Sequence, residues 1–517
     1  MKRILIVLLF ICLIPYESTY AHEVKIKMRT QMNIKTTKPI PADTVITINS
    51  FAYEFDYVSY KIRISFGLTD GRTFDVTHNK VGDMLDYVVE DVQDLWNDRI
   101  ITDVIPSMGS VMSSSNADIY QHNLRREMEA DALDYISMIK ENGLEFVDPF
   151  LESYLYSLVV KIAPKYLLDG RPSNVNLVIQ QNPTANACCF PNGTIVINTG
   201  LLAALHSEDE LVAILSHEIA HFILDHAVKN VNERVKRQNR AEFWAGLATV
   251  ITAATEGVIA ANNRYYMPGA ATATVAAMSS SIATNVIEQS GMAYNIEQER
   301  EADELAKEVL VLLGYDRNAL ATALSRMEKI YIEERNQAMY FDSETHPSLV
   351  GRIKKAGTPS EETNVKYEQM VSFAITNAAL MKYGDRRFRQ CIPLATQNIN
   401  NGVAIADDYI LKAQCLLSLE DTPETNKEVL ELLGKAKEFD ASNINIDKVE
   451  IIATLRLGKN EQALQILTEY IAKLSQTNEE LSGIYDQDMW AATKQFILSE
   501  KRWANNMITK IKGMINT

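Results

Sequence analysis

The chain has 517 residues, of which 47% are hydrophobic and 23% are charged, a composition typical of globular proteins with a normal core. Its length predicts roughly three domains. The formal net charge of −16 argues against a basic face that could bind phosphate groups, so we expect no nucleic-acid partner.

The first residues are predicted to be an export signal. Lys2 and Arg3 precede the apolar run Ile4–Pro15, and the small residue Ala21 ends the stretch that follows. The apolar run is shorter than the ~20 residues that a spanning helix needs. We therefore predict a signal peptide over 1–21 and an exported protein in the periplasm or cell envelope, soluble or peripherally associated with the membrane. A retained N-terminal anchor is the alternative.

Residues 22–106 are predicted to form a β-rich module. Apolar residues alternate in three stretches up to Phe66, as in strands with one buried face. The dipeptide Asp70-Gly71 then predicts a hairpin into another strand. Between Met84 and Leu95 the apolar residues recur at helical spacing, so we predict one amphipathic helix that closes the module.

A small, polar stretch at 107–117 is predicted to be a linker. Patterns typical of helices and strands follow it, with helices predicted at Ile119–Glu141, Pro149–Ala163 and Leu211–Val228 and strands at Asn174–Gln181 and Thr194–Asn198. The Ala-rich segment 241–287 is interrupted by polar residues, and Pro268 and Gly269 lie within it. We favour close-packed soluble helices there over a hairpin that touches a membrane.

Residues 358–517 are predicted to be an all-α region. Gly458, Ala463 and Leu467 follow one another at separations of five and four, which resembles the spacing of a tetratricopeptide repeat. Small side chains at such positions let paired helices approach closely. We therefore predict a tetratricopeptide-like helical array, and an irregular helical bundle is the alternative.

The sequence His217-Glu218-Ile-Ala-His221 lies within the helix predicted at Leu211–Val228. Four residues turn an α-helix by roughly 400°, so the two histidines project from nearly the same face, one turn apart. Both imidazoles can then reach one Zn²⁺ at ~2.0–2.1 Å. Glu218 lies on the adjoining face, where its carboxylate can take a proton from the attacking water. We predict one zinc ion per chain and Glu218 as the general base.

A catalytic zinc site takes three protein ligands and leaves one position open. Candidates for the third ligand lie in an acidic segment of a predicted helix, and spacing alone does not choose between Glu297, Glu299 and Glu301. An acidic cluster of this kind is also common on a solvated helix face. The residues by themselves therefore leave the third ligand open.

Three motifs resemble those of peptidase family M48, in the same order. They are His217-Glu-Ile-Ala-His221, Glu299-Arg-Glu-Ala-Asp303 and Thr345-His-Pro-Ser-Leu-Val-Gly-Arg352. The resemblance covers roughly Tyr120–Ala356, and we predict a metallopeptidase domain at 118–357. It implies a mostly helical, zincin-like catalytic domain with a small sheet, so the fold class of the whole chain is predicted to be α+β.

The resemblance also implies roles for residues around the metal. Glu299 would be the third ligand, and Asp303, one turn further on, would orient a liganding histidine. His346 and Arg352 would stabilise the oxyanion or cap the metal. His226 also matches the family and is predicted to be structural.

A substrate-binding strand is the next implication of the resemblance. Asn186, Ala187 and Cys188 would belong to an edge strand on which a peptide adds as a further strand. Tyr265 and Tyr266 are weaker candidates for oxyanion donors, since only their phenols suggest the role.

The repeat-bearing periplasmic branch of the family implies a zinc metalloendopeptidase that cuts exported or misassembled envelope proteins. Its substrate would be a protein or peptide, and the helical array would dock an envelope protein partner. One alternative is a chaperone or scaffold on the same fold that does not cut. Another is a zinc hydrolase that acts on something other than a peptide. The complete set of His217, Glu218, His221 and Glu299 argues against the chaperone.

Overall fold

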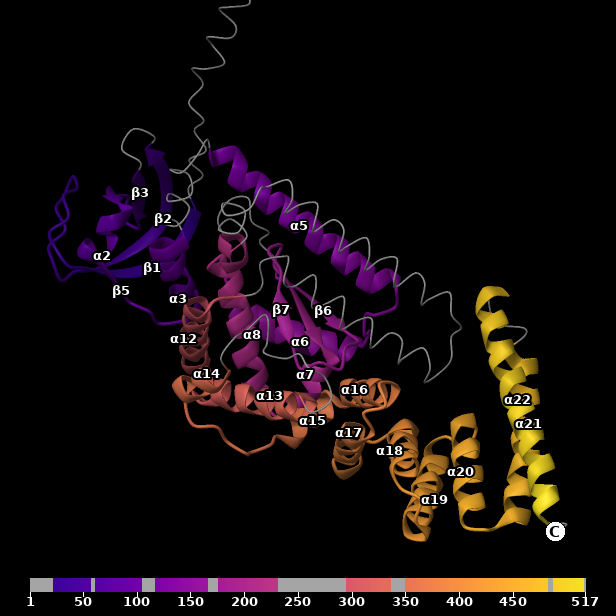
Figure 1. Ribbon diagram of the computed structural model, residues 1–517. Helices are drawn as coiled ribbons and strands as arrows, with labels where there is room; N and C mark the ends of the chain where they lie inside the picture. Colours follow the sequence, from indigo (N-terminus) through magenta and orange to yellow (C-terminus); the bar gives the residue numbers. More distant parts are fainter. Residues whose placement is uncertain are drawn as a thin grey trace, which may run out of the picture. The chain divides into compact units, whose positions relative to one another are not determined.

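The computed structural model describes residues 22–56, 61–104, 117–165, 175–230, 294–335, 349–481 and 487–515 (Figure 1). The signal peptide, nearly all of the linker, the Ala-rich segment and His346 lie outside these described residues. The chain divides into two compact units, of which the second contains Glu127–Ile162, Val175–Phe222 and everything described from His226 onward.

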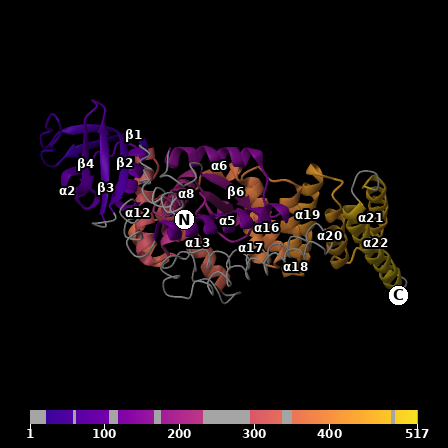
Figure 2. The ribbon, with the colours of Figure 1, turned by 90° about the horizontal axis from the view of Figure 1, so that it is seen from above.

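The first unit contains an antiparallel sheet with the strand order β4-β3-β2-β1-β5 (Figure 2). Its strands are β1 (His22–Thr30), β2 (Val45–Asp56), β3 (Lys61–Leu68), β4 (Thr73–Thr77) and β5 (Leu85–Tyr87). Ile62, Ile64 and Phe66 alternate along β3 and are almost fully buried, as the alternating pattern predicts. Gly71 adopts a φ of 82° in the turn between β3 and β4, which confirms the hairpin.

The prediction of one helix between Met84 and Leu95 is wrong for the first half of that stretch. Leu85–Tyr87 is the strand β5, which pairs with β1, and the helix α3 (Val92–Arg99) begins only at Val92. The side chain of Asp91 caps α3 by accepting a hydrogen bond from the backbone of Asp94. The open edge of β1 supplies unpaired backbone groups that a strand can satisfy, and a short apolar run does not distinguish the two structures.

The second unit contains a three-stranded sheet with the order β6-β8-β7. β6 (Asn176–Gln180) runs parallel to β8 (Thr194–Asn198), and β7 (Ala187–Cys189) runs antiparallel to it. All five residues of β8 are buried. The helices before and after the sheet are α5 (Ala117–Glu141), α6 (Pro149–Ile162), α7 (Thr199–Ala204) and α8 (Glu208–Ile223). β7 is therefore an edge strand among the strands that the structure describes.

Three further helices of this unit pack against one another: α12 (Ile296–Leu313), α13 (Ala319–Arg335) and α14 (Leu349–Ala356). Asn295 begins α12 with a capping box, in which its side chain accepts from the backbone of Gln298 while the Gln298 side chain accepts from the backbone of Asn295. Gly314 ends α12 with a φ of 80°. These two caps fix where the acidic residues of α12 lie.

The rest of the chain is helical, with each helix from α16 onward packed on the next (Figure 1). The helices are α15 (Val365–Met370), α16 (Ser372–Gly384), α17 (Phe388–Asn400), α18 (Ala406–Leu419), α19 (Pro423–Phe439), α20 (Ile444–Arg456), α21 (Asn460–Leu481) and α22 (Gln487–Ile515). Gly458 turns the chain between α20 and α21 with a φ of 74°, and Ala463 and Leu467 are fully buried. Assignment to the tetratricopeptide class stays a prediction.

The structure is mostly helical and has two small sheets, so it is consistent with the predicted α+β class. None of the helices in the described ranges combines the length and the apolar character needed to cross a membrane.

Candidate metal centre

The helix predicted at Leu211–Val228 is interrupted. α8 ends at Ile223, Leu224 and Asp225 form a turn, and residues 226–230 are helical again. Asp225 adopts a φ of 63°, a left-handed conformation that Asp tolerates better than most residues. The pattern of apolar residues does not reveal this turn, because residues on both sides of it are buried. The break decides where His226 lies.

Ligand-type atoms of His217, His221 and Glu299 converge between α8 and α12. The two Nε2 atoms are 3.1 Å apart. Nε2 of His221 lies 3.4 Å from Oε1 of Glu299, and Nε2 of His217 lies 3.7 Å from Oε2. All three side chains are at least 98% buried.

These separations fit a four-coordinate ion such as zinc. Ligand atoms at ~2.0–2.1 Å from the ion in tetrahedral geometry lie about 3.3–3.4 Å from one another. Burial and the charge of His217 hold the pKa of His221 well below its usual range, so this imidazole is neutral and can offer a lone pair. Two imidazoles and a carboxylate are a donor set that zinc accepts.

The other two acidic candidates are engaged elsewhere. Glu297 is exposed, and it forms an ion pair with Arg300 at 2.5 Å. Glu301 points toward His226. Of the three acids that the sequence left open, only Glu299 faces both histidines.

Asp303 orients the imidazole of His217. Its Oδ1 lies 3.0 Å from Nδ1 of His217. Burial opposes ionisation of Asp303, but the charge of Arg352 and the hydrogen bonds from His217 and Arg352 outweigh it and hold the pKa of Asp303 below its ordinary value. With a carboxylate beside Nδ1, we assign the ring proton to that nitrogen, so Nε2 carries the lone pair that a metal ligand requires.

His221 is oriented in the same way through an additional histidine. Nδ1 of His221 lies 2.8 Å from Nδ1 of His226, whose Nε2 lies 3.1 Å from Oε2 of Glu301. The Glu301 carboxylate accepts a hydrogen bond from Nε2–H of His226, and the unprotonated Nδ1 of His226 then accepts one from Nδ1–H of His221. Nε2 of His221 is thereby left without a proton, as a metal ligand requires. The sequence prediction that His226 is structural missed this contact.

Tyr294 is a neighbour of the centre that sequence reasoning missed. Its ring stacks on that of His221, with ring centroids 3.7 Å apart and an angle of 11° between the planes. It is buried, and burial raises its pKa well above the usual range. No motif marks this tyrosine, which lies 73 residues after His221 in the sequence and meets it only in the folded chain.

Arg352 of α14 is buried against two carboxylates of α12. Its Nη1 lies 2.5 Å from Oε2 of Glu299, and it donates two hydrogen bonds to Asp303, at 2.7 and 2.9 Å. Burial lowers the pKa of a guanidinium, but Glu299 and Asp303 outweigh it, so the pKa of Arg352 is raised. The arginine balances the charge of the acids that approach the histidines.

Glu218 lies beside this cluster and next to the edge strand. It is 98% buried, and its Oε2 accepts a hydrogen bond of 3.1 Å from the backbone N–H of Cys189 in β7. The neighbouring thiol of Cys188 is also buried, and burial together with the charge of Glu218 raises its pKa. The thiol therefore stays protonated and is a poor metal ligand here.

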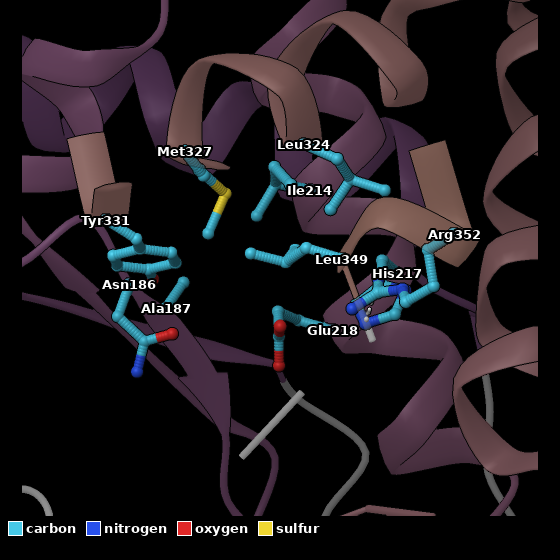
Figure 3. A pocket seen from close by; sticks show the side chains of 10 residues that line it. All are labelled: Asn186, Ala187, Ile214, His217, Glu218, Leu324, Met327, Tyr331, Leu349 and Arg352. Carbon is cyan, nitrogen blue, oxygen red and sulfur yellow. Dashed lines mark hydrogen bonds between the residues drawn. The ribbon is translucent and has the colours of Figure 1, made fainter. Parts of the chain in front are cut away.

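A cavity opens beside Glu218 (Figure 3). The polar groups His217, Glu218 and Arg352 lie on one part of its wall, and Asn186 and Ala187 line another. The remaining wall is apolar and consists of Ile214, Leu324, Met327, Tyr331 and Leu349. A substrate in this cavity would contact both the edge-strand segment and the cluster of charged groups.

The structure thus brings together most of the residues predicted for the site. His217, Glu218, His221, Glu299, Asp303 and Arg352 form one buried cluster, and Asn186 and Ala187 adjoin it. His346 lies outside the described residues, as do Tyr265 and Tyr266. Their roles stay predictions.

A comparison with protein families identifies the domain that carries this cluster. Residues 149–360 match the model described as Peptidase family M48. This chain carries an M48 domain. The match contains α8, α12 and α14 and ends a few residues after α14.

Similar proteins bear names that agree with this assignment. The chain is 27% identical over 198 residues to a Vibrio cholerae relative that carries the name beta-barrel assembly-enhancing protease, and the match covers 38% of this chain and 37% of the relative. It is 23% identical over 226 residues to the beta-barrel assembly-enhancing protease of Escherichia coli, over 44% of this chain and 41% of that protein. Mitochondrial metalloendopeptidase OMA1 of Schizosaccharomyces pombe is 24% identical over 250 residues, 48% of this chain and 64% of its own length. The matches to the two bacterial relatives therefore span about two fifths of those proteins.

Proposed function

We propose that the chain is a zinc-dependent metalloendopeptidase. The observation that carries this proposal is the convergence of His217, His221 and Glu299, with Glu218 beside them at the edge of a cavity. The ring tautomers set by Asp303 and by the His226–Glu301 pair leave Nε2 of both histidines ready to bind the metal. One zinc ion per chain would occupy this position.

The reaction would be hydrolysis of a peptide bond. A bound zinc ion supplies Lewis acidity and lowers the pKa of water toward ~7. Glu218 accepts the proton of the attacking water and passes it to the leaving amine. The N–H of Cys189 holds the carboxylate in place between strand and helix. Arg352 keeps Glu299 and Asp303 in position, and we assign it this positioning role in place of an oxyanion donor.

The substrate would bind in extended form along β7. The N–H of Phe190 donates to Thr194 and that of Asn198 donates to Asn186, so these alternate residues face β8. The backbone groups of Ala187 and Cys189 point the other way. No described strand pairs with this outer edge of β7. A peptide could add there as a further strand, next to Glu218.

We propose exported or misassembled envelope proteins as the substrates. The signal peptide predicted from the sequence supports export to the periplasm or envelope, and two similar bacterial proteins are named for enhancing β-barrel assembly. The helical array, tetratricopeptide-like on this proposal, would recruit an envelope partner.

Replacement of Glu218 by Gln tests the enzymatic proposal. The amide keeps the shape of the side chain but cannot accept a proton, so we expect cleavage of casein to fall by roughly 10²–10⁴-fold. Zinc content, measured by mass spectrometry, should stay at one ion per chain. Glu304→Gln, an exposed change on α12, is the matched control and should cut at the wild-type rate. Cleavage by Glu218→Gln near that rate would exclude the general-base role.

A further inference from the structure

The apolar wall of the cavity has no part in the chemistry proposed above. Leu324, Met327 and Tyr331 follow one another on α13 at separations of three and four, so they share one face of the helix. Ile214 lies one turn before Glu218 on α8 and faces the same space (Figure 3). Four separate elements therefore contribute to a cavity whose reactive groups lie at one end.

The hydroxyl of Tyr331 does not make this wall polar. It donates a hydrogen bond of 2.6 Å to the backbone oxygen of Ala185, and the tyrosine is buried. The ring, and not the hydroxyl, is thus available to a ligand. The cation among the described lining residues is Arg352, which Glu299 and Asp303 already neutralise. Within the described lining residues, an acidic ligand side chain would therefore find no charge partner.

We propose that this wall is a specificity pocket that takes an apolar side chain of a residue flanking the scissile bond. The inference rests on the proposed peptidase function and adds a substrate preference to it. A peptide strand paired with the backbone of Ala187 passes Glu218, and alternate side chains of a strand point to the same side. One of those side chains must meet the wall that Leu324 and Met327 form.

The preference follows from desolvation. A charged side chain in this pocket would lose its hydration and gain no partner, whereas an apolar one gains from leaving water. Met327 is unbranched and flexible, so the wall can adapt to side chains of different size. The pocket should therefore discriminate between substrate side chains by their polarity more strongly than by their size.

Binding and cleavage of matched peptides test the pocket separately from the chemistry. The peptides share one sequence and differ only at the position before or after the scissile bond, which carries Ala, Leu, Phe or Asp. Binding is measured by fluorescence anisotropy with full-length, zinc-loaded Glu218→Gln, and cleavage with the wild type. We expect the Leu peptide to exceed the Asp peptide by at least about 10-fold in affinity and in kcat/KM.

The variant Met327→Ala tests whether the apolar wall sets the preference for the substrate side chain. The shorter side chain should raise the ratio of kcat/KM for the Phe peptide to that for the Ala peptide by roughly 10-fold. Met138→Ala is the matched control, because Met138 is 8% exposed against 7% for Met327, and it lies on α5 away from the cavity lining. It should leave the ratio unchanged. Leu324→Ala replaces the first variant should Met327→Ala fail to fold.

The outcomes separate the two proposals. Cleavage by the wild type with equal rates for Leu and Asp at both positions would overturn the pocket and leave the peptidase function standing. Preferential binding of the Leu peptide without any cleavage would support the pocket and overturn the peptidase function. An unchanged Phe to Ala ratio in a folded wall variant, Met327→Ala or Leu324→Ala, would show that another surface sets the preference.

Discussion

The metal centre and the helical array are both built from amphipathic helices, but they bury different side chains. In α8, α12 and α14 the buried residues include charged or ligand-type groups such as His221, Glu299 and Arg352. The cores of the array consist of aliphatic and aromatic side chains, of which Val429, Leu433, Ile451 and Tyr470 are almost fully buried. Burying ionisable groups costs folding free energy unless they are paired. A region that buries so many of them has a role beyond folding.

The array also buries polar groups, and one of them, Asp408, is hydrogen-bonded within the array. Asp408 accepts hydrogen bonds from Thr376, from Asn398 and from the backbone of Ile405, and so joins three helices. Burial raises the pKa of Asp408, and these hydrogen bonds oppose the rise. In the metal centre, by contrast, the Nε2 atoms of His217 and His221 face each other at 3.1 Å, and a carboxylate approaches the same point. The first arrangement serves packing, whereas the second has the donor set and spacing of a cation site.

Of the changes predicted here, replacement of Glu299 should reduce zinc binding most. Glu299→Ala removes one of three ligands, so we expect zinc affinity to fall by more than about 100-fold, beyond the range seen for residues that only support a ligand. Metal content after dialysis against a chelator measures the change. Glu297→Ala, two residues earlier on the same helix and exposed, is the control and should keep its zinc. Full zinc in Glu299→Ala would reassign the third ligand.

Features that depend on local periodicity could be predicted from the sequence. The helices α8 and α12, the strands β1 to β4 and β6 and the helices of the array repeat apolar residues at the period of their structure. The approach of His226 to Glu301 could not be predicted, because the two lie 75 residues apart and meet only in the folded chain. The turn at Leu224–Asp225 was missed as well, and it is this turn that redirects His226. The strand β5 was missed because its partner β1 is distant in the sequence.

His226 should contribute less to zinc binding than the ligands do. His226→Phe keeps an aromatic ring but removes both nitrogens, so Nδ1 of His221 loses its acceptor. We expect zinc affinity to fall by about 10–100-fold with the fold intact, and Glu301→Gln to show a smaller loss in the same direction. Competition with a chromophoric chelator gives the affinities, and circular dichroism checks the fold. Zinc affinity equal to that of the wild type in both variants would leave His226 a packing role only.

Removal of most of the array should have the smallest effect on the centre itself, provided that the cut is placed correctly. The domain boundary predicted at 357 suggests a chain that ends near Ser360. In the structure, however, the side chain of Asn377 on α16 accepts a hydrogen bond of 3.0 Å from Thr199 and donates one of 3.1 Å to Gln181. Tyr367 of α15 also donates to the backbone oxygen of Leu202. A cut at Ser360 would expose these faces of the catalytic domain and should lower its melting temperature.

A chain that ends at Gly402 keeps α15, α16 and α17 and removes the helices from α18 onward. Every group proposed for the chemistry is retained, so zinc content and the rate of casein cleavage should match those of the full chain. Cleavage of the natural envelope target should fall, because the removed helices are the proposed recruiting surface. Faster casein cleavage would instead mean that the array restrains the active site. If the shortened chain cut both substrates at the rate of the full chain, the array would neither recruit the target nor restrain the active site. The metal centre and the array would then not differ in function in the way proposed.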